Sequence, residues 1–502
     1  MDPEPAMPVK APIDVLKTCV IFVFPAFGGL LFGYDIGATS AAVPILETPS
    51  VNGVSWGQLN TLQNGMVTSA SLLGAVIGSA IAIFLRDKIG RKFELLLAAG
   101  CYAVGAILSA AAPVFPVLIL GKMLYGLGIG FALHAAPAYL AEVGHPRIRG
   151  LLISMKEVFI GIGIELGYLI GLPCVTVLGG WRIVFGMALL FALIMKTGMV
   201  WLPESPRWLL LAGRHEDARE ALVWTRGKPA KEDEMALTEE FDDIKKSSAE
   251  TMPHQGWFHL FNGQYTRPML IGLSLMFFQQ VTGQPSVLYY ATSMFQRAGL
   301  AMGQEATGIA GILGAFKLAC TCVAVLTVDK FGRRPLLLIG VGGMFASSLL
   351  IGIACQVAYS SAAATYITII MLFVFVGSYQ ISFGPISWVM IGEIFPVSVR
   401  GQAIAICTLT NFATNFVVAF LLPTFQKLEG PGGLYLGFAA MAALAWVVIH
   451  FVVIETKMLT LEEIEALMIG PKRSKRGATM TNGHMTGADS DVQLPKRSLN
   501  NI

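Results

Sequence analysis

The sequence predicts an all-α membrane protein whose roughly 12 transmembrane helices form two pseudo-symmetric six-helix bundles. The composition, the long apolar runs and an internal repeat all indicate this class. Of the 502 residues, 55% are hydrophobic and only 13% are charged, whereas soluble domains carry about 25% charged residues. The formal net charge of +3 is too small to suggest a nucleic-acid partner. We therefore expect a lipid bilayer as the partner and no nucleic acid.

Apolar runs long enough to cross a bilayer recur along the chain. A spanning helix needs about 20 mainly apolar residues, and about 12 runs qualify, with bounds good to about 2–4 residues. They lie near 18–40, 62–85, 93–113, 116–140, 150–174, 181–203, 268–296, 305–328, 335–357, 364–391, 400–424 and 432–454. Gly, Pro and Gln residues interrupt the seventh and eighth runs, which are the least regular.

The basic residues between these runs are placed asymmetrically. Lys and Arg follow the second, fourth, eighth and tenth runs, whereas the loops near 111–116, 175–180 and 358–363 contain none. By the positive-inside rule, both termini and all even-to-odd connections face the cytosol. We expect an integral, multi-pass membrane protein, and the sequence leaves plasma, vacuolar and plastid membranes open.

The chain divides into five segments. A cytosolic N-terminal segment (1–17) precedes the first six-helix bundle (18–203), and a polar stretch (204–266) predicts short amphipathic helices on the cytosolic surface. The second bundle (268–455) is followed by a cytosolic tail (456–502), which we expect to be disordered after about residue 470 because it is basic and rich in Gly, Ser and Asn.

The two bundles repeat one another in sequence. Segment 86–92 recurs as 328–334, segment 142–150 recurs as 393–401, and Glu204 recurs as Glu455. Three matched landmarks at nearly one offset indicate a duplicated unit. Transporters built from such repeats place the substrate near the midplane, between the repeats.

With these landmarks the chain resembles the sugar-porter branch of the major facilitator superfamily over residues 18–467. The resemblance rests on Gly33-Tyr34-Asp35, Asp-x-x-Gly-Arg loops at 87–91 and 329–333, Pro203 through Trp208, Gln279 through Gly283, Gly384-Pro385 with Trp388, and Glu455-Thr456-Lys457. Segments 152–157 and 284–290 look most like the plant and algal vacuolar or plastidic glucose transporters, a group similar to xylose–proton symporters. The resemblance implies the major facilitator fold and alternating-access transport of a glucose- or xylose-like monosaccharide. It implies no cofactor, and we expect a functional monomer.

The seventh run carries amides suited to a sugar. A sugar hydroxyl both donates and accepts hydrogen bonds, as an amide does. Gln280 and Gln284 are four residues apart and share one helical face, with Gln279 beside them. Gly283 and Pro285 should break the helix, which is tolerated at membrane depth where a cavity is lined. The alternative is that the amides bond a neighbouring helix; we favour the site.

The resemblance implies a set of sugar-binding residues from both halves. They are Gln279, Gln280, Gln284, Tyr289, Tyr290, Trp388, Asn411, Glu157 and Phe32. Gln284 stands for a commoner Asn and Phe412 for a commoner Trp, which leaves the preference between hexose and pentose open. Glu157 stands where sugar porters usually have a glutamine. A carboxylate at mid-membrane is functional by default, but a structural ion pair with Lys156 is an equally open reading.

Asp35 predicts proton coupling. It lies in an apolar run that is otherwise uncharged from Val20 to Leu46, and a carboxylate whose surroundings change can take up a proton on one side and release it on the other. By resemblance, Lys122 stands where proton-coupled relatives have an arginine that pairs with this aspartate. The alternative is that Asp35 only braces helix packing. Glu157 and Glu165 are further candidate proton carriers.

The resemblance also implies a cytosolic gate of ion pairs. Its residues are Asp87, Arg91, Glu142, Arg149, Glu204 and Arg207 in the first half, and Asp329, Arg333, Glu393, Arg400 and Glu455 in the second. Arg91 would pair with Glu142 and Glu204. Arg333 would pair with Glu393 and Glu455. Each exposed pair contributes only about 0–1 kcal/mol, but a network that changes with conformation shifts the equilibrium.

Several other functions find no support. Cys320 and Cys322 lack the ligand spacing of a metal site, His134 is expected to be a packing residue, and no nucleophile–base pair indicates an enzyme. The remaining alternatives are a passive sugar uniporter, a proton/sugar antiporter on an organelle membrane and, less favoured, a sugar sensor. Export of drugs or organic ions is disfavoured by the amide-rich seventh run.

Overall fold

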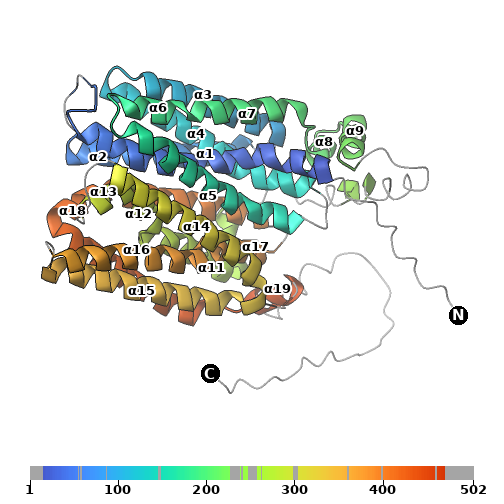
Figure 1. Ribbon diagram of the computed structural model, residues 1–502. Helices are drawn as coiled ribbons and strands as arrows, with labels where there is room; N and C mark the ends of the chain where they lie inside the picture. The colour runs from blue at the N-terminus through green and yellow to red at the C-terminus, as the bar shows by residue number, and fades with distance from the viewer. Residues whose placement is uncertain are drawn as a thin grey trace.

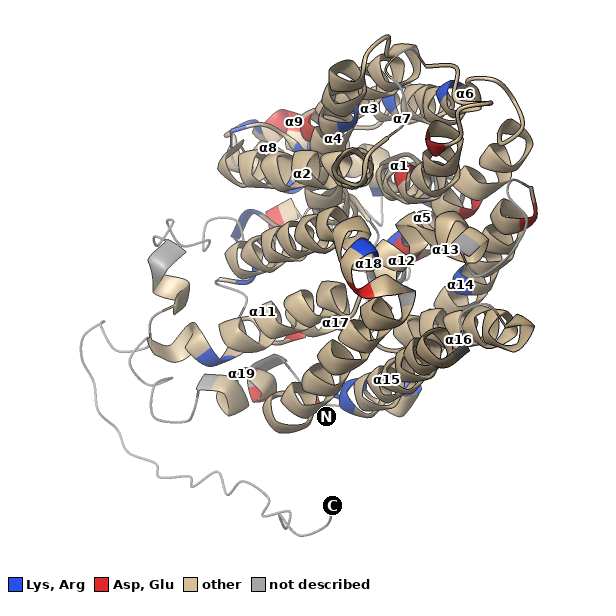
Figure 2. Ribbon diagram, turned by 90° about the vertical axis from the view of Figure 1, so that its left-hand side faces the viewer, with Lys and Arg blue, Asp and Glu red and all other residues tan. Residues whose placement is uncertain are grey.

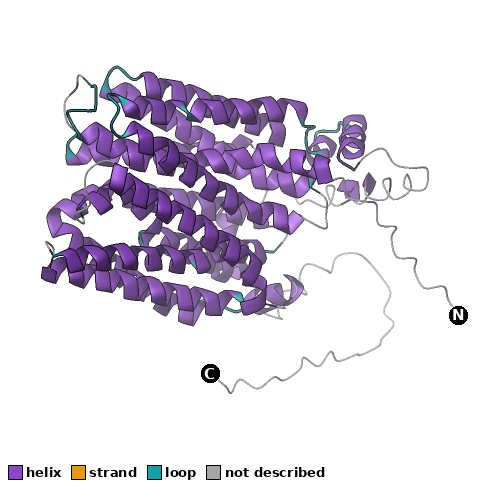
Figure 3. Ribbon diagram, in the orientation of Figure 1, coloured by secondary structure: helices purple, strands orange, loops and turns teal. Residues whose placement is uncertain are grey.

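A computed structural model describes residues 15–54, 56, 59–85, 88–144, 149–226, 238, 241–242, 244–246, 257–261, 263–297, 304–358, 361–396, 399–457, 459 and 461–469. Every regular element in these ranges is a helix (Figure 3). Viewed from one end of the helices, most of the ribbon carries no charged residue (Figure 2). The all-α class is thereby confirmed.

The first half occupies the upper part of Figure 1. Its helices are α1 (Val15–Glu47), α2 (Thr61–Leu85), α3 (Arg91–Ala111), α4 (Phe115–Val143), α5 (Arg149–Cys174), α6 (Gly180–Gly186) and α7 (Ala188–Trp201). Glycines let these apolar helices approach closely, as small residues do in membranes. A Cβ on Gly126 of α4 would meet the backbone of Ser71 in α2, and a Cβ on Gly163 of α5 would meet the backbone of Leu30 in α1.

The second half lies below it (Figure 1). Its helices are α11 (Thr266–Val281), α12 (Gln284–Tyr289), α13 (Ala291–Arg297), α14 (Gln304–Phe331), α15 (Arg333–Ala358), α16 (Ala362–Ile381), α17 (Phe383–Glu393) and α18 (Arg400–Val452). Gly430 has φ 70° inside α18, so this element is two spans that meet at a kink. Glycine adopts a positive φ without the steric cost that other residues incur.

The predicted spans correspond to these helices. Eleven described segments are long and apolar enough to cross a membrane. The predicted seventh span is not one continuous helix: it consists of three shorter helices, α11, α12 and α13. Gly283, with φ 92°, separates α11 from α12.

Short helices lie at the end of the bundles that the sequence assigns to the cytosol. They are α8 (Pro206–Leu211), α9 (His215–Arg226), two 3-10 turns (Trp257–Phe261 and Gly263–Tyr265) and α19 (Leu461–Ile469). In Figure 1, α8, α9 and α19 are at the right. We refer to this end as the cytosolic side and to the opposite end as the outer side. The predicted tail beyond residue 470 lies outside the described residues.

The two halves are joined on the outer side. Ser40 Oγ of α1 lies 3.2 Å from Thr292 Oγ1 of α13, and the Tyr168 hydroxyl of α5 donates to the carbonyl of Leu288 in α12 at 2.8 Å. A Cβ on Gly65, near the outer end of α2, would meet the backbone of α18. The outer side is therefore closed in this conformation.

Candidate functional site

A buried ion pair lies inside the first half. Lys122 Nζ of α4 is 2.9 Å from Asp35 Oδ1 of α1, and the two residues are only 2% and 5% exposed. Ser71 Oγ of α2 donates to Asp35 Oδ2 at 2.5 Å. The ammonium also donates to Thr39 Oγ1 at 2.6 Å. Each carboxylate oxygen of Asp35 therefore has a donor from a different neighbouring helix, Oδ1 from α4 and Oδ2 from α2.

The expected pairing of Asp35 with Lys122 is thus present as a contact. The ammonium also lies 4.7 Å from the centroid of the Phe185 ring, a cation–π arrangement that adds stabilisation when water is excluded. The hydroxyl donor Ser71 was not anticipated from the sequence, because a serine in an apolar run gives no sign of the helix it faces.

The expected sugar-binding amides gather around the break at Gly283. Gln279, Gln280 and Gln284 are all 5% exposed or less, and Asn411 of α18 is 4% exposed. Gln279 Nε2 donates to the carbonyl of Phe383 at 2.8 Å, and Asn411 Nδ2 donates to Gln279 Oε1 at 2.6 Å. Gln279 therefore also bonds to a neighbouring helix, which was the alternative reading for this run of amides.

Other polar atoms at the break have no partner. Gln280 Oε1, Gln284 Nε2, Ser286 Oγ and the Tyr289 hydroxyl are buried without a hydrogen bond among the described residues. A buried polar group without a partner costs about 1–3 kcal/mol, and most native proteins have few of them. Four within ten residues of chain make this break a candidate binding site for a polar ligand. Tyr290 differs, since its hydroxyl donates to the carbonyl of Ala419 at 3.2 Å.

Aromatic side chains from both halves lie around the same region. Phe32 of α1 meets Phe412 of α18 edge to face, with ring centroids 6.0 Å apart. Trp388 of α17 has the Lys156 ammonium of α5 at 4.2 Å from its ring centroid. Lys156 Nζ also lies 3.8 Å from Glu157 Oε1. The same ammonium therefore contacts the second half through Trp388 and forms the ion pair that was one of the two interpretations of Glu157.

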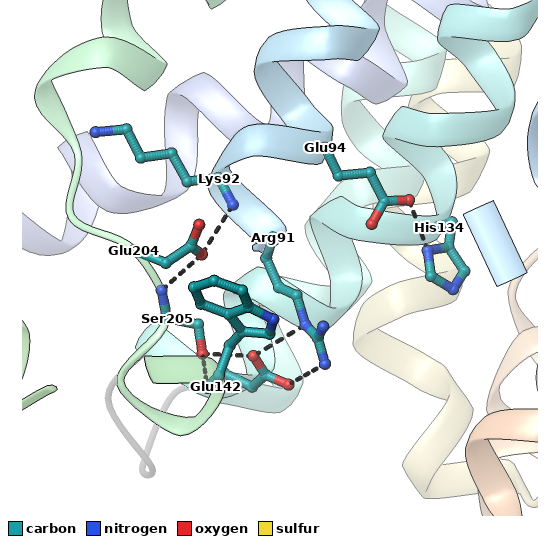
Figure 4. Close-up of polar contacts among 8 residues, drawn as sticks. Arg91, Lys92, Glu94, His134, Glu142, Glu204 and Ser205 are labelled. Atoms are coloured by element: carbon teal, nitrogen blue, oxygen red, sulfur yellow. Dashed lines mark hydrogen bonds and ion pairs between the residues drawn. The ribbon is translucent and has the colours of Figure 1, made fainter. Parts of the chain in front are cut away.

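The first cytosolic ion-pair network joins α3, α4 and the segment before α8 (Figure 4). Arg91 Nη2 lies 3.4 Å from Glu142 Oε1, and Ser205 Oγ donates to Glu142 Oε2 at 2.5 Å. Glu204 accepts the backbone N–H groups of Lys92 at 2.9 Å and Ser205 at 2.8 Å. Burial raises the pKa of Glu204, and its backbone hydrogen bonds and Arg91 oppose that rise.

The second half repeats this network. Arg333 Nη2 lies 2.9 Å from Glu393 Oε1, and Thr456 Oγ1 donates to Glu393 Oε2 at 2.6 Å. Glu455 accepts the backbone N–H groups of Arg333 and Arg334, each at 3.0 Å. The hydroxyls of Ser205 and Thr456 were missed in the sequence, although each directly follows a glutamate that was identified.

The other expected gate residues behave differently. Arg400 Nε donates to the carbonyl of Phe395 at 3.1 Å. Arg207 is exposed and makes no ion pair with a described residue, so it does not join the network as expected, because the first turn of α8 directs it to solvent. Asp87 and the side chains of Arg149 and Asp329 lie outside the described residues.

His134 makes a polar contact that was not expected. Its Nδ1 lies 2.8 Å from Glu94 Oε1, and the Glu94 side chain is fully buried (Figure 4). Glu94 comes one helical turn after Arg91 on α3. The expectation of a packing residue was therefore incomplete: His134 bridges α4 to α3 beneath the cytosolic network.

Comparisons with known proteins agree with this geometry. The family model "Sugar (and other) transporter" matches residues 21–468. D-xylose-proton symporter-like 2 of Arabidopsis thaliana is 46% identical, over 90% of this chain and 91% of that protein. D-xylose-proton symporter-like 3, chloroplastic, from the same plant is 42% identical, over 89% and 82%. The solved proton:xylose symporter XylE of the major facilitator superfamily, bound to 6-bromo-6-deoxy-D-glucose, superposes with TM-score 0.75 at 29% identity, over 90% of this chain and 99% of that chain.

Proposed function

Because the chain belongs to the sugar transporter family within the major facilitator superfamily, we propose that it moves a monosaccharide across a membrane by alternating access, together with a proton carried by Asp35. The observation that carries the sugar assignment is the group of unpartnered polar atoms at the break between α11 and α12. Sugar hydroxyls supply both donors and acceptors to such atoms. We take glucose or xylose as the first substrates to test, since the relatives' names include xylose.

The proton assignment rests on the pair of Asp35 and Lys122. A proton that binds Asp35 neutralises the carboxylate and weakens its attraction to the ammonium. Lys122 then keeps its hydrogen bond to Thr39, and Ser71 faces a neutral carboxyl group in place of a carboxylate. This change alters the packing of α1 against α4 and α2. A conformational equilibrium shifts only by the difference in proton affinity between its two states, so Asp35 must meet different surroundings when each side is open.

The cytosolic networks bear on how the two halves move during transport. Each ties the start of α3 or α15 to the end of α4 or α17 through an arginine–glutamate pair and a hydroxyl. We propose that they keep each half rigid, so that the halves move as bodies around the sugar. Alternating access in transporters with internal repeats is largely such rigid-body rocking.

Uptake into proteoliposomes tests the function. Labelled glucose and xylose are supplied with and without an inward proton gradient, to the wild type and to Asp35→Asn. We expect the gradient to accelerate uptake only in the wild type, while Asp35→Asn still exchanges sugar across the membrane. Equal uptake with and without the gradient in both proteins would identify a passive uniporter.

Two further alternatives have distinct signatures in the same assay. Acceleration by an outward instead of an inward gradient would identify a proton/sugar antiporter. Binding of sugar without uptake would identify a sensor. The membrane is also a matter for proposal: we place the protein in an organelle membrane, with a plastid considered first because one relative is named chloroplastic, and with both termini in the cytosol. We expect it to work as a monomer.

A further inference from the structure

Lys317 is a buried cation at the interface between the two halves. It lies near the middle of α14 and is 5% exposed. Within the described part of the chain, its ammonium has neither a hydrogen bond nor an ion pair, and the neighbouring residue Leu318 packs against α5, the helix that carries Glu157. A cation at this depth is costly and usually has a functional partner. Lys317 is not predicted from the sequence, because one lysine in an apolar run does not reveal what it faces.

Glu157 belongs to the other half and already has a partner there. Lys156 Nζ lies 3.8 Å from it, although adjacent residues on a helix do not face each other. The contact is long, and the same ammonium is shared with the Trp388 ring at 4.2 Å. The Lys156–Glu157 pair is therefore a weak one that a better-placed cation can replace.

The register of α5 against α14 indicates in which conformation Lys317 can approach Glu157. The two helices pack through Gly161, where a Cβ would lie 2.9 Å from Leu318. Glu157 is one turn, about 6 Å, to the cytosolic side of this contact, whereas Glu165 is one turn to the outer side, against Gly314. The outer side is closed here by the bond between Tyr168 and Leu288. If the halves rock about the Gly161 contact, closure of the cytosolic side brings Glu157 toward α14.

We propose that Glu157 exchanges its lysine during transport: Lys156 holds it while the cytosolic side is open, and Lys317 holds it across the two halves when that side closes. The exchange keeps the mid-membrane carboxylate next to a cation in both conformations, which avoids the large cost of an unpaired buried charge. It also makes Lys317 a positioning residue, because it stabilises one conformation and not the other. This inference rests on the proposed alternating access.

Distances between spin labels test the exchange without any sugar. The labels replace Phe93 and Phe331, which are 57% and 63% exposed at the cytosolic ends of α3 and α14, in a chain whose seven native cysteines are substituted. Double electron–electron resonance in lipid nanodiscs then reports the proportion of cytosol-closed (short) to cytosol-open (long) distances. The variants are Lys317→Met, Glu157→Gln and, as the control, Lys196→Met, which removes an exposed lysine on α7.

We expect two distance populations in the wild type. Lys317→Met and Glu157→Gln should each lower the ratio of short to long distances, by roughly 5- to 150-fold for a coupling of ordinary size. Lys196→Met should leave the ratio unchanged, and the charge-exchanged chain with Glu157→Lys and Lys317→Glu should recover the short population. That last chain also provides the test if a single variant does not fold.

Three results would overturn the exchange. They are a wild type with one population, an unchanged ratio in both Lys317→Met and Glu157→Gln, and an equal loss in Lys196→Met. The proposed function can fail separately: a chain that shows the exchange but takes up no sugar in proteoliposomes refutes the transport assignment and leaves the ion-pair exchange standing.

Discussion

Removal of the Lys122 charge is the sharpest test of the site in the first half. In Lys122→Met, Asp35 stays buried at 5% exposure and loses the ammonium that now lies 2.9 Å away. The hydroxyl of Ser71 remains as its donor. Removing one partner of a buried ion pair typically costs about 3–5 kcal/mol, whereas replacing both partners by neutral groups is often close to neutral. We therefore expect Lys122→Met to destabilise strongly and the double variant with Asp35→Asn to recover most of the loss.

The free energy of unfolding in bicelles, measured by steric trapping, follows this cycle. The four proteins are the wild type, each single variant and the double variant, and Lys196→Met is the control because Lys196 is an exposed lysine on α7. A buried, directly bonded pair should give a coupling energy of at least about 1–3 kcal/mol. The reasoning is refuted if the two single effects simply add, or if Lys122→Met is as stable as Lys196→Met. In either case Asp35 and Lys122 are not energetically coupled, and the ion pair no longer supports Asp35 as the proton-coupling residue.

Three further outcomes are expected. Gln280→Ala should raise the KM for sugar about tenfold, the loss of one well-placed hydrogen bond, with little change in the proton dependence of uptake; an unchanged KM would place the sugar elsewhere. Gly283→Ala should lower thermal stability by at least about 1 kcal/mol, because φ is 92° and the new Cβ would meet the ring of Phe438, and thermal unfolding in detergent measures this. Burial raises the pKa of Glu204. Its contribution to stability is therefore present in full below its unfolded pKa of about 4.3 and declines as the pH rises through the raised value. Glu204→Gln should flatten the dependence of Tm on pH in this range, and an unaltered slope would contradict this prediction.

The two cytosolic networks match in more than their charges. Glu204 accepts the backbone N–H of Lys92 at the start of α3, and Glu455 accepts those of Arg333 and Arg334 at the start of α15. In each network the hydroxyl of the residue that follows this glutamate donates to the glutamate of the arginine pair. Glu204 and Glu455 therefore cap α3 and α15, where an acidic group near a helix N-terminus is favourable. The motif thus serves helix capping as well as ion pairing, and duplication preserved both roles.

Some site residues could be identified from the sequence because each is unusual in an apolar run. Asp35, Glu157 and the amides of the seventh span are polar at a depth where polar groups are costly. Gly283 with Pro285 predicts a broken helix, and in the structure α11 ends just before Gly283. Ser71 and Lys317 were missed, since a single serine or lysine in an apolar run has several possible environments and its neighbours along the chain do not distinguish them.

The sequence by itself determined where the apolar spans lie, that a unit of six spans is duplicated and where the membrane-embedded chain turns polar. Those features follow from hydrophobicity and periodicity, which are local properties of the chain. Only the tertiary structure decided which polar groups meet: Lys122 with Asp35 across 87 positions, Ser205 with Glu142 across 63, and Lys156 with Trp388 across the two halves. Such contacts depend on helix rotation and register, which close glycine packing sets between helices that are far apart in the chain.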